Sequence, residues 1–269
     1  AVAVKVIQLT DRPKIDALAL KACIENDPAL TAKLMRVVNS SLFGLPGKVA
    51  DLNQALALLG TKTLKLLVLG FSFPQFSDDK ISQHVLTRYW LHSLTKAVAS
   101  REVAQRLWKS NGDEALIAGL LQDLGLLVLV KELGEPFVRF LERIDLETAD
   151  VMVAQKQTLG FCHIELTARL LDRWQLPPSL VRVIGSYPTD ESLDTLTPDE
   201  CSLAKILHLS ELLAQLLADR RTGVLGRLME TGESYCNLTI EDLSFIVDEL
   251  SGKVLQLRDV LSLNLQDDL

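Results

Sequence analysis

The chain has 269 residues and a formal net charge of −7; 48% of its residues are hydrophobic and 23% are charged. This length and mixture predict a globular protein with a full hydrophobic core and exclude an intrinsically disordered chain. Because acidic residues outnumber basic ones, 35 to 28, we expect no general attraction to nucleic acids or to anionic membranes.

The composition favours helices. Gly (14) and Pro (9) are scarce and only 5% of the residues are aromatic, which predicts an all-α fold. The four cysteines, Cys23, Cys162, Cys201 and Cys236, form no CxxC pair, which is typical of reduced thiols in a cytoplasmic protein. The opening AVAVKVIQL lacks a methionine and a signal-peptide pattern, so we expect a piece of a longer protein.

Helix caps divide the chain into short helices. Asp27-Pro28 opens a helix that Asn39-Ser40-Ser41 ends, and Gly60 is placed to separate two helices that follow Asp51. Further helices are predicted over 82–108, 113–131, 147–159, 163–174, 178–187 and 198–221. The helix over 113–131 contains the most apolar run of the chain, 115–130, which is too short to span a membrane.

The last fifty residues carry an apolar stripe with alternating spacings of four and three residues, formed by Leu243, Val247, Leu250, Val254, Leu257 and Leu261. Such a stripe is typical of two helices that wind around each other. The pattern leaves two interpretations open. The helix either packs back on its own domain, or it forms a homodimer or leads into a further domain beyond position 269.

Polar residues with chemical potential lie within apolar helices. His92 belongs to the segment WLHSLTKAVA, and Asp123 lies in ALIAGLLQDLGLLVL, where an ionised carboxylate needs a partner. His163 is placed at a helix start, and Glu211 follows His208 on a later helix. A separate basic patch, Arg220, Arg221 and Arg227, is more typical of a solvated helix end than of a phosphate site.

Several stretches resemble the HDOD domain, the HD-related output domain of bacterial signalling proteins. The similarity is densest over 27–73, and it continues through 115–129 and 159–184. The resemblance implies a two-lobed helical domain over 1–218, with a small lobe at 1–76 and an HD-like lobe at 80–218. Residues 219–269 would form a helical extension or a linker to a missing domain.

The resemblance also implies a degenerate metal site. The family is a branch of the HD metal-dependent phosphohydrolases, whose active members bind metal through a His, a His-Asp doublet and a later Asp. His92 and Asp123 match two of these positions, but Gln122 replaces the histidine of the doublet, and Glu211 matches the late aspartate. Because a neutral amide is a poor transition-metal ligand, we expect this site to bind no metal and no cofactor and to contain no catalytic residue. His163 is a further candidate residue near the site.

Three functions follow from this interpretation. The first is a non-catalytic regulatory module that acts through a protein partner or an adjacent signalling domain, with His92 donating to Asp123 as a purely structural pair. The second is a mononuclear phosphohydrolase that uses His92, Asp123 and Glu211. The third is a regulatory segment of a larger protein that carries an output domain such as a GGDEF cyclase.

Overall fold

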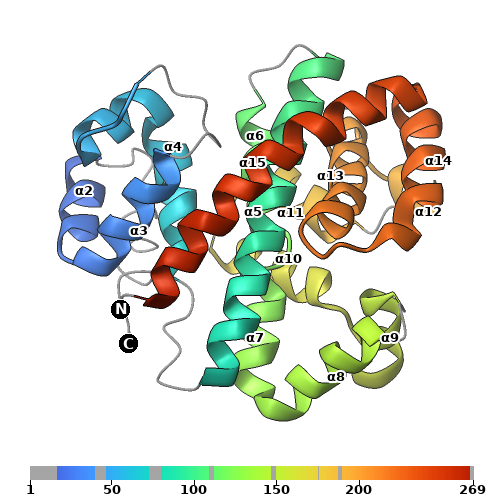
Figure 1. Cartoon of the computed structure of the whole chain (residues 1–269), viewed down its shortest axis with the longest axis horizontal. Coiled ribbons are helices and arrows are strands. Elements are labelled where there is room, and N and C mark those ends of the chain that lie inside the picture. Colours follow the sequence, from blue (N-terminus) through green and yellow to red (C-terminus); the bar gives the residue numbers. More distant parts are fainter. Residues whose placement is uncertain are drawn as a thin grey trace. The chain divides into compact units, whose positions relative to one another are not determined.

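A computed structural model describes residues 17–39, 47–72, 80–108, 112–146, 150–174, 176–186 and 190–266 (Figure 1). Within these ranges the fold is all-α, and no strand occurs. The chain forms two compact units, one of residues 1–75 with 248–269 and one of residues 76–247. These units divide the chain differently from the expected boundaries, because 219–247 belong to the larger unit rather than to a separate extension.

In the described part of the first unit, the helices α2 (Ala17–Glu25), α3 (Pro28–Val38) and α4 (Leu52–Ser72) pack on one another. Asp27 caps α3 by accepting a hydrogen bond from the Leu30 N–H at 3.0 Å, as the sequence predicts. Gly60 has a φ of 75° and kinks α4 where the sequence predicts a break between two helices. The Asn39 side chain donates to the carbonyls of Met35 and Val49 and so joins the end of α3 to the segment before α4.

The second unit is built around the long helix α5 (Lys80–Trp108), against which α6 and α13 pack (Figure 1). The remaining elements are α6 (Asp113–Leu121), α7 (Leu124–Leu133), α8 (Glu135–Leu146), α9 (Val151–Leu159), α10 (His163–Arg173), α11 (Pro178–Gly185), α12 (Asp190–Leu193), α13 (Pro198–Leu217), η1 (Thr222–Val224), α14 (Leu225–Cys236) and α15 (Ile240–Gln266). The last of these, α15, continues from the second unit into the first.

One predicted helix is wrong in its extent. The apolar segment 113–131 is two helices, because Gln122 and Asp123 form a turn between α6 and α7. The backbone of Asp123 (φ −99°, ψ 11°) leaves the helical region at this point. The turn places a buried carboxylate at a junction between helices instead of in the middle of one.

The apolar stripe of α15 is used within the chain itself. Leu243, Leu250, Val254 and Leu257 are all buried, Val247 is half-buried, and the side chain of Leu261 lies outside the described residues. This burial favours packing of the stripe against its own chain over packing against a second copy of the chain. The expected homodimer through this stripe therefore has no free surface at these four positions.

All four cysteines lie in described residues and are free thiols, Cys23 and Cys162 buried and Cys201 and Cys236 half-buried. Among the described residues, no helix combines the length and the apolar character needed to cross a lipid bilayer.

Candidate functional site

Three of the predicted site residues meet inside the second unit. His92 of α5, Asp123 of the α6–α7 turn and Glu211 of α13 each place one potential ligand atom within 4.8 Å of the others. They are brought together by the packing of α6 and α13 against α5. By distance and donor type alone, this triad could hold one divalent ion.

Lys96 changes the character of this triad. Its Nζ lies 3.0 and 2.9 Å from the two oxygens of Asp123, and 2.5 Å from Oε2 of Glu211. Only 2% of the Lys96 side chain is exposed, and only 4% of Asp123. The ammonium therefore binds the carboxylate oxygens that a metal ion would need, deep in the core.

The expected direct bond between His92 and Asp123 is wrong. His92 Nε2 is 3.9 Å from Asp123 Oδ2, beyond hydrogen-bond distance, and instead lies 3.2 Å from Glu211 Oε2. Its other ring nitrogen, Nδ1, lies 2.9 Å from Oδ2 of Asp219. The reason is the position of Lys96, one helical turn further along α5, which takes both oxygens of Asp123.

The cluster consists of two complementary rows on neighbouring helices. Arg88, His92 and Lys96 follow one another at four-residue spacing on α5. Glu211 belongs to α13, and Asp219 lies in the turn after it. Asp219 Oδ1 lies 3.9 Å from Arg88 Nε. With Asp123, three carboxylates face three basic side chains when His92 is protonated, so the charges of the cluster balance.

The pKa values of the cluster follow from this arrangement. Burial alone would lower the pKa of His92, but the carboxylates of Asp219 and Glu211 together raise it well above its ordinary value. Burial opposes the charge of Glu211 as well, yet the nearby Lys96 and His92 hold its pKa well below the usual range. The pKa of Lys96 is raised, because Asp123 and Glu211 together outweigh its burial. At neutral pH the cluster is therefore a set of buried ion pairs.

His163 reaches the cluster from α10. Its Nδ1 lies 2.7 Å from the Gln155 side-chain oxygen, which also accepts its backbone N–H, and Nε2 lies 3.5 Å from Asp123 Oδ1. The close packing of α7 against α10 depends on Gly125, since a Cβ there would overlap the His163 carbonyl oxygen. His163 thus has a structural position beside Asp123, fixed by Gln155.

A second glycine brings Asp123 and Lys96 together. At Gly119 of α6, a Cβ would lie 2.7 Å from Ser100 Oγ and 3.1 Å from the Lys96 carbonyl oxygen. The glycine therefore lets α6 approach α5 closely. By contrast, the side chain of Gln122 is buried, and its Oε1 finds no hydrogen-bond partner among the described residues.

His92, Asp123, His163 and Glu211 were predicted from the sequence, whereas Lys96 and Asp219 were not. A signal for Lys96 exists, since it follows His92 by four residues as the one charged residue of the stretch TKAVA. Asp219 carries no comparable signal, because only the packing of α13 on α5 brings it to His92 across 127 positions.

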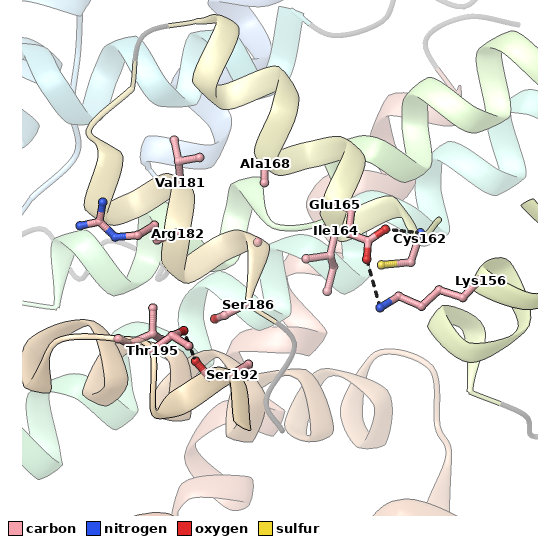
Figure 2. Close-up of a pocket in the computed structure, with 12 residues that line it drawn as sticks. Lys156, Cys162, Ile164, Glu165, Ala168, Val181, Arg182, Ser186, Ser192 and Thr195 are labelled. Carbon is pink, nitrogen blue, oxygen red and sulfur yellow. Dashed lines mark hydrogen bonds and ion pairs between the residues drawn. The ribbon is translucent and has the colours of Figure 1, made fainter. Parts of the chain in front are cut away.

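A pocket of about 550 Å³ lies elsewhere in the same unit, between α9, α10, α11 and the α12 region (Figure 2). Lys156 and Glu165 pair across its edge at 3.0 Å, and the hydroxyls of Ser186, Ser192 and Thr195 also line it. No residue of the Lys96 cluster lines this pocket. The buried cluster is therefore separate from it.

The comparisons with known proteins agree with the geometry. The profile of the HDOD domain matches residues 1–188. An uncharacterised protein of Treponema pallidum (strain Nichols) is 28% identical over 182 residues, which are 65% of this chain and 34% of that protein. The chain therefore spans about a third of the length of this curated relative.

Two solved structures share the fold. A Shewanella amazonensis SB2B protein, provisionally assigned as a phosphohydrolase, has a TM-score of 0.66 and 21% identity over 97% of this chain and 93% of its own. The MmoQ response regulator of Methylococcus capsulatus (Bath) has a TM-score of 0.52 and 23% identity over 91% of this chain and 95% of its own. At these identities the likeness establishes the fold alone.

Proposed function

Because the chain belongs to the HDOD family, we propose that it is a non-catalytic regulatory module that acts through a neighbouring domain or a protein partner in a bacterial signalling protein. The observation that carries this proposal is the Lys96 ammonium bound to Asp123 and Glu211. A divalent ion bound by Asp123 and Glu211 would lie next to the Lys96 ammonium, which already binds the same carboxylate oxygens. The residues present therefore do not fit a metal while Lys96 keeps its position, and no hydrolytic step is derived from them.

The cluster suits a structural role in such a module. It connects α5, the α6–α7 turn and α13 through buried charges, and removing one partner of a buried pair costs about 3–5 kcal/mol. Separating these segments would therefore expose or unpair buried charges. A relay of this kind needs two arrangements whose balance a partner shifts by differential affinity.

The location and context of the module belong to the same proposal. The pattern of free cysteines supports a cytoplasmic protein, and the greater length of the Treponema relative supports a module within a larger chain. An output domain such as a GGDEF cyclase would then lie outside these residues.

The catalytic question is tested with the whole chain, with manganese or zinc, and with bis(p-nitrophenyl) phosphate and a cyclic dinucleotide as substrates. We expect no turnover above that of the Asp123→Asn variant and no stoichiometric metal after dialysis. Metal-dependent turnover by the wild-type chain that Asp123→Asn abolishes would overturn the proposal.

One observation favours a second candidate, a mononuclear phosphohydrolase. His92, Asp123 and Glu211 keep potential ligand atoms within 4.8 Å, and this arrangement could bind an ion if the Lys96 ammonium moved away. The Lys96→Met variant separates the two candidates. If Lys96 is what excludes metal, the variant binds manganese and the wild-type chain does not; if the wild-type chain binds manganese equally well, the second candidate is favoured.

A further inference from the structure

The pocket between α9, α10, α11 and the α12 region has the size and the lining of a small-molecule site (Figure 2). Its volume of about 550 Å³ lies within the range of about 300–1,000 Å³ that is typical of pockets for organic ligands. Apolar side chains form part of its wall, namely Ile164 and Ala168 of α10, Val181 of α11, and Leu196. A ligand with an apolar portion would gain free energy by burying that portion here.

A pair of opposite charges stands at one edge of this pocket. Lys156 Nζ of α9 lies 3.0 Å from Glu165 Oε1 of α10, and 51% and 41% of the two side chains are exposed. Glu165 is held on its other side, because its Oε2 accepts the Cys162 N–H at 3.2 Å (Figure 2). These contacts leave both groups with spare capacity, since an ammonium has three N–H donors and a carboxylate has about four lone-pair sites. The pair can therefore bind a cationic and an anionic group of one ligand at the same time.

The other polar groups of the lining do not favour an anionic ligand. The hydroxyls of Ser186 and Thr195 donate their hydrogens to main-chain carbonyls three residues earlier, both at 2.7 Å, so they offer acceptors rather than donors to the pocket. The guanidinium of Arg182 bonds to Glu200 through Nε and Nη2, and Figure 2 shows it pointing away from Ser186. A purely anionic ligand would thus meet one ammonium that already has a carboxylate beside it.

We infer that this pocket binds a free amino acid with an apolar side chain. The α-carboxylate of the ligand bonds to Lys156 and its α-ammonium bonds to Glu165, so that the four charges alternate in sign and sum to zero. The apolar side chain of the ligand lies against the apolar wall of the pocket. A ligand with a single charge is disfavoured, because one member of the edge pair then repels it at close range. Each end of a peptide carries only one of the two charges, which favours the free amino acid over a peptide.

This inference goes beyond the proposed function and does not depend on it, because the pocket shares no lining residue with the Lys96 cluster. It adds a class of ligand for the module to sense. Glu165 accepts the N–H of Cys162, and the next residue, His163, lies beside Asp123. A ligand on Glu165 therefore binds next to the start of the helix that reaches the buried cluster.

The test is isothermal titration of the whole chain with L-phenylalanine and L-leucine, and with three probes that each lack one feature. L-Phenylalaninamide lacks the carboxylate, N-acetyl-L-phenylalanine lacks the ammonium, and glycine lacks the apolar side chain. We expect saturable binding of phenylalanine or leucine at a single site. Each incomplete probe should bind about tenfold or more weakly, the loss that follows from removing a charge-assisted hydrogen bond or an apolar contact. If the amide or the acetylated probe binds as tightly as phenylalanine, only one charge is recognised and the inference fails.

Two variants connect this binding to the pocket edge. Lys156→Met and Glu165→Gln each remove one charge, and each should weaken the binding of phenylalanine about tenfold or more. Glutamine keeps a side-chain oxygen that can accept the Cys162 N–H, so the start of α10 stays capped. Arg139→Gln is the matched control, since Arg139 is 75% exposed and pairs with Glu135 on α8, outside the pocket lining. Phenylalanine affinity should be unchanged in this variant.

The inference is overturned if neither phenylalanine nor leucine binds to the wild-type chain. It is also overturned if either Lys156→Met or Glu165→Gln binds phenylalanine as tightly as the wild-type chain does, because both charges are then not needed.

Discussion

Replacing Lys96 by methionine tests the central feature of the second unit. Methionine keeps an unbranched apolar side chain of similar length, so the variant removes the ammonium with little change in packed volume. Asp123 and Glu211 then lose the cation that binds three of their oxygens. Both carboxylates remain shielded, with 4% and 21% of their side chains exposed.

The expected loss in free energy of unfolding is large. Removing one partner of a buried ion pair costs about 3–5 kcal/mol, and one ammonium here serves two carboxylates. We therefore expect a loss of about 4 kcal/mol, against a total stability of about 5–15 kcal/mol for a typical protein. In a chain of this size the corresponding fall in Tm is about 10 °C.

Urea unfolding followed by circular dichroism measures this loss at pH 7 and again near pH 5. The variant should recover part of its stability at the lower pH, because carboxylates without their cation protonate more readily. Lys156→Met is the control, since Lys156 is 51% exposed and its pair with Glu165 should contribute no more than about 1 kcal/mol. A loss below about 1 kcal/mol in Lys96→Met, with no dependence on pH, would refute the idea that the ammonium holds the cluster together.

Further predictions concern pH, close packing and assembly. Because the pKa of His92 is raised in the folded state, its contribution is complete below about pH 6.5 and is lost as pH rises through the folded value; His92→Gln should flatten this alkaline decline in thermal scans. The pKa of His208 is lowered to about 4 by burial and then by Arg227, so it adds an acid decline between about pH 6.5 and pH 4, which His208→Asn should remove. Gly125→Ala should unfold the chain or separate α7 from α10, whereas Gly252→Ala, with open space around it, should be neutral or stabilising by up to about 1 kcal/mol. Light scattering of the whole chain at high concentration should give a monomer mass. A dimer would contradict the assignment of the stripe to internal packing if a charged substitution at the buried Leu250 abolished it and one at the exposed Leu255 did not.

Much of the helical framework could be predicted from local rules. The cap at Asp27, the break at Gly60 and the helix over 82–108 follow from side-chain capping and from apolar periodicity, which act over a few residues. The break at Asp123 could not be predicted in this way, because the surrounding residues are apolar helix formers. The contact of α7 with α10 next to this break, which Gly125 permits, is a tertiary feature that local rules do not predict.

Most residues of the candidate site could be predicted from the sequence, but not which basic residue pairs with which carboxylate. A buried carboxylate at Asp123 requires a partner, and this physical requirement is visible in the sequence. The identity of the partner is not, because His92 and Lys96 lie on the same face of one helix and both are within its reach. Distance in three dimensions selects Lys96, and α13 then supplies Glu211 and Asp219 to His92.

The ammonium of Lys96 has a consequence for the order in which such a centre can lose its metal. A lysine introduced beside a tightly held dication would add a positive charge at bonding distance, so that step is opposed while the ion is strongly bound. If Gln122 occupies the position of the doublet's histidine, as we propose from the family resemblance, the amide would weaken the hold on the ion first, and the lysine would then compensate the two carboxylates left behind. Reconstructed ancestors should therefore acquire the amide before, or together with, the lysine, and ancestors with the lysine beside an intact histidine-aspartate doublet should be poorly stable when loaded with metal.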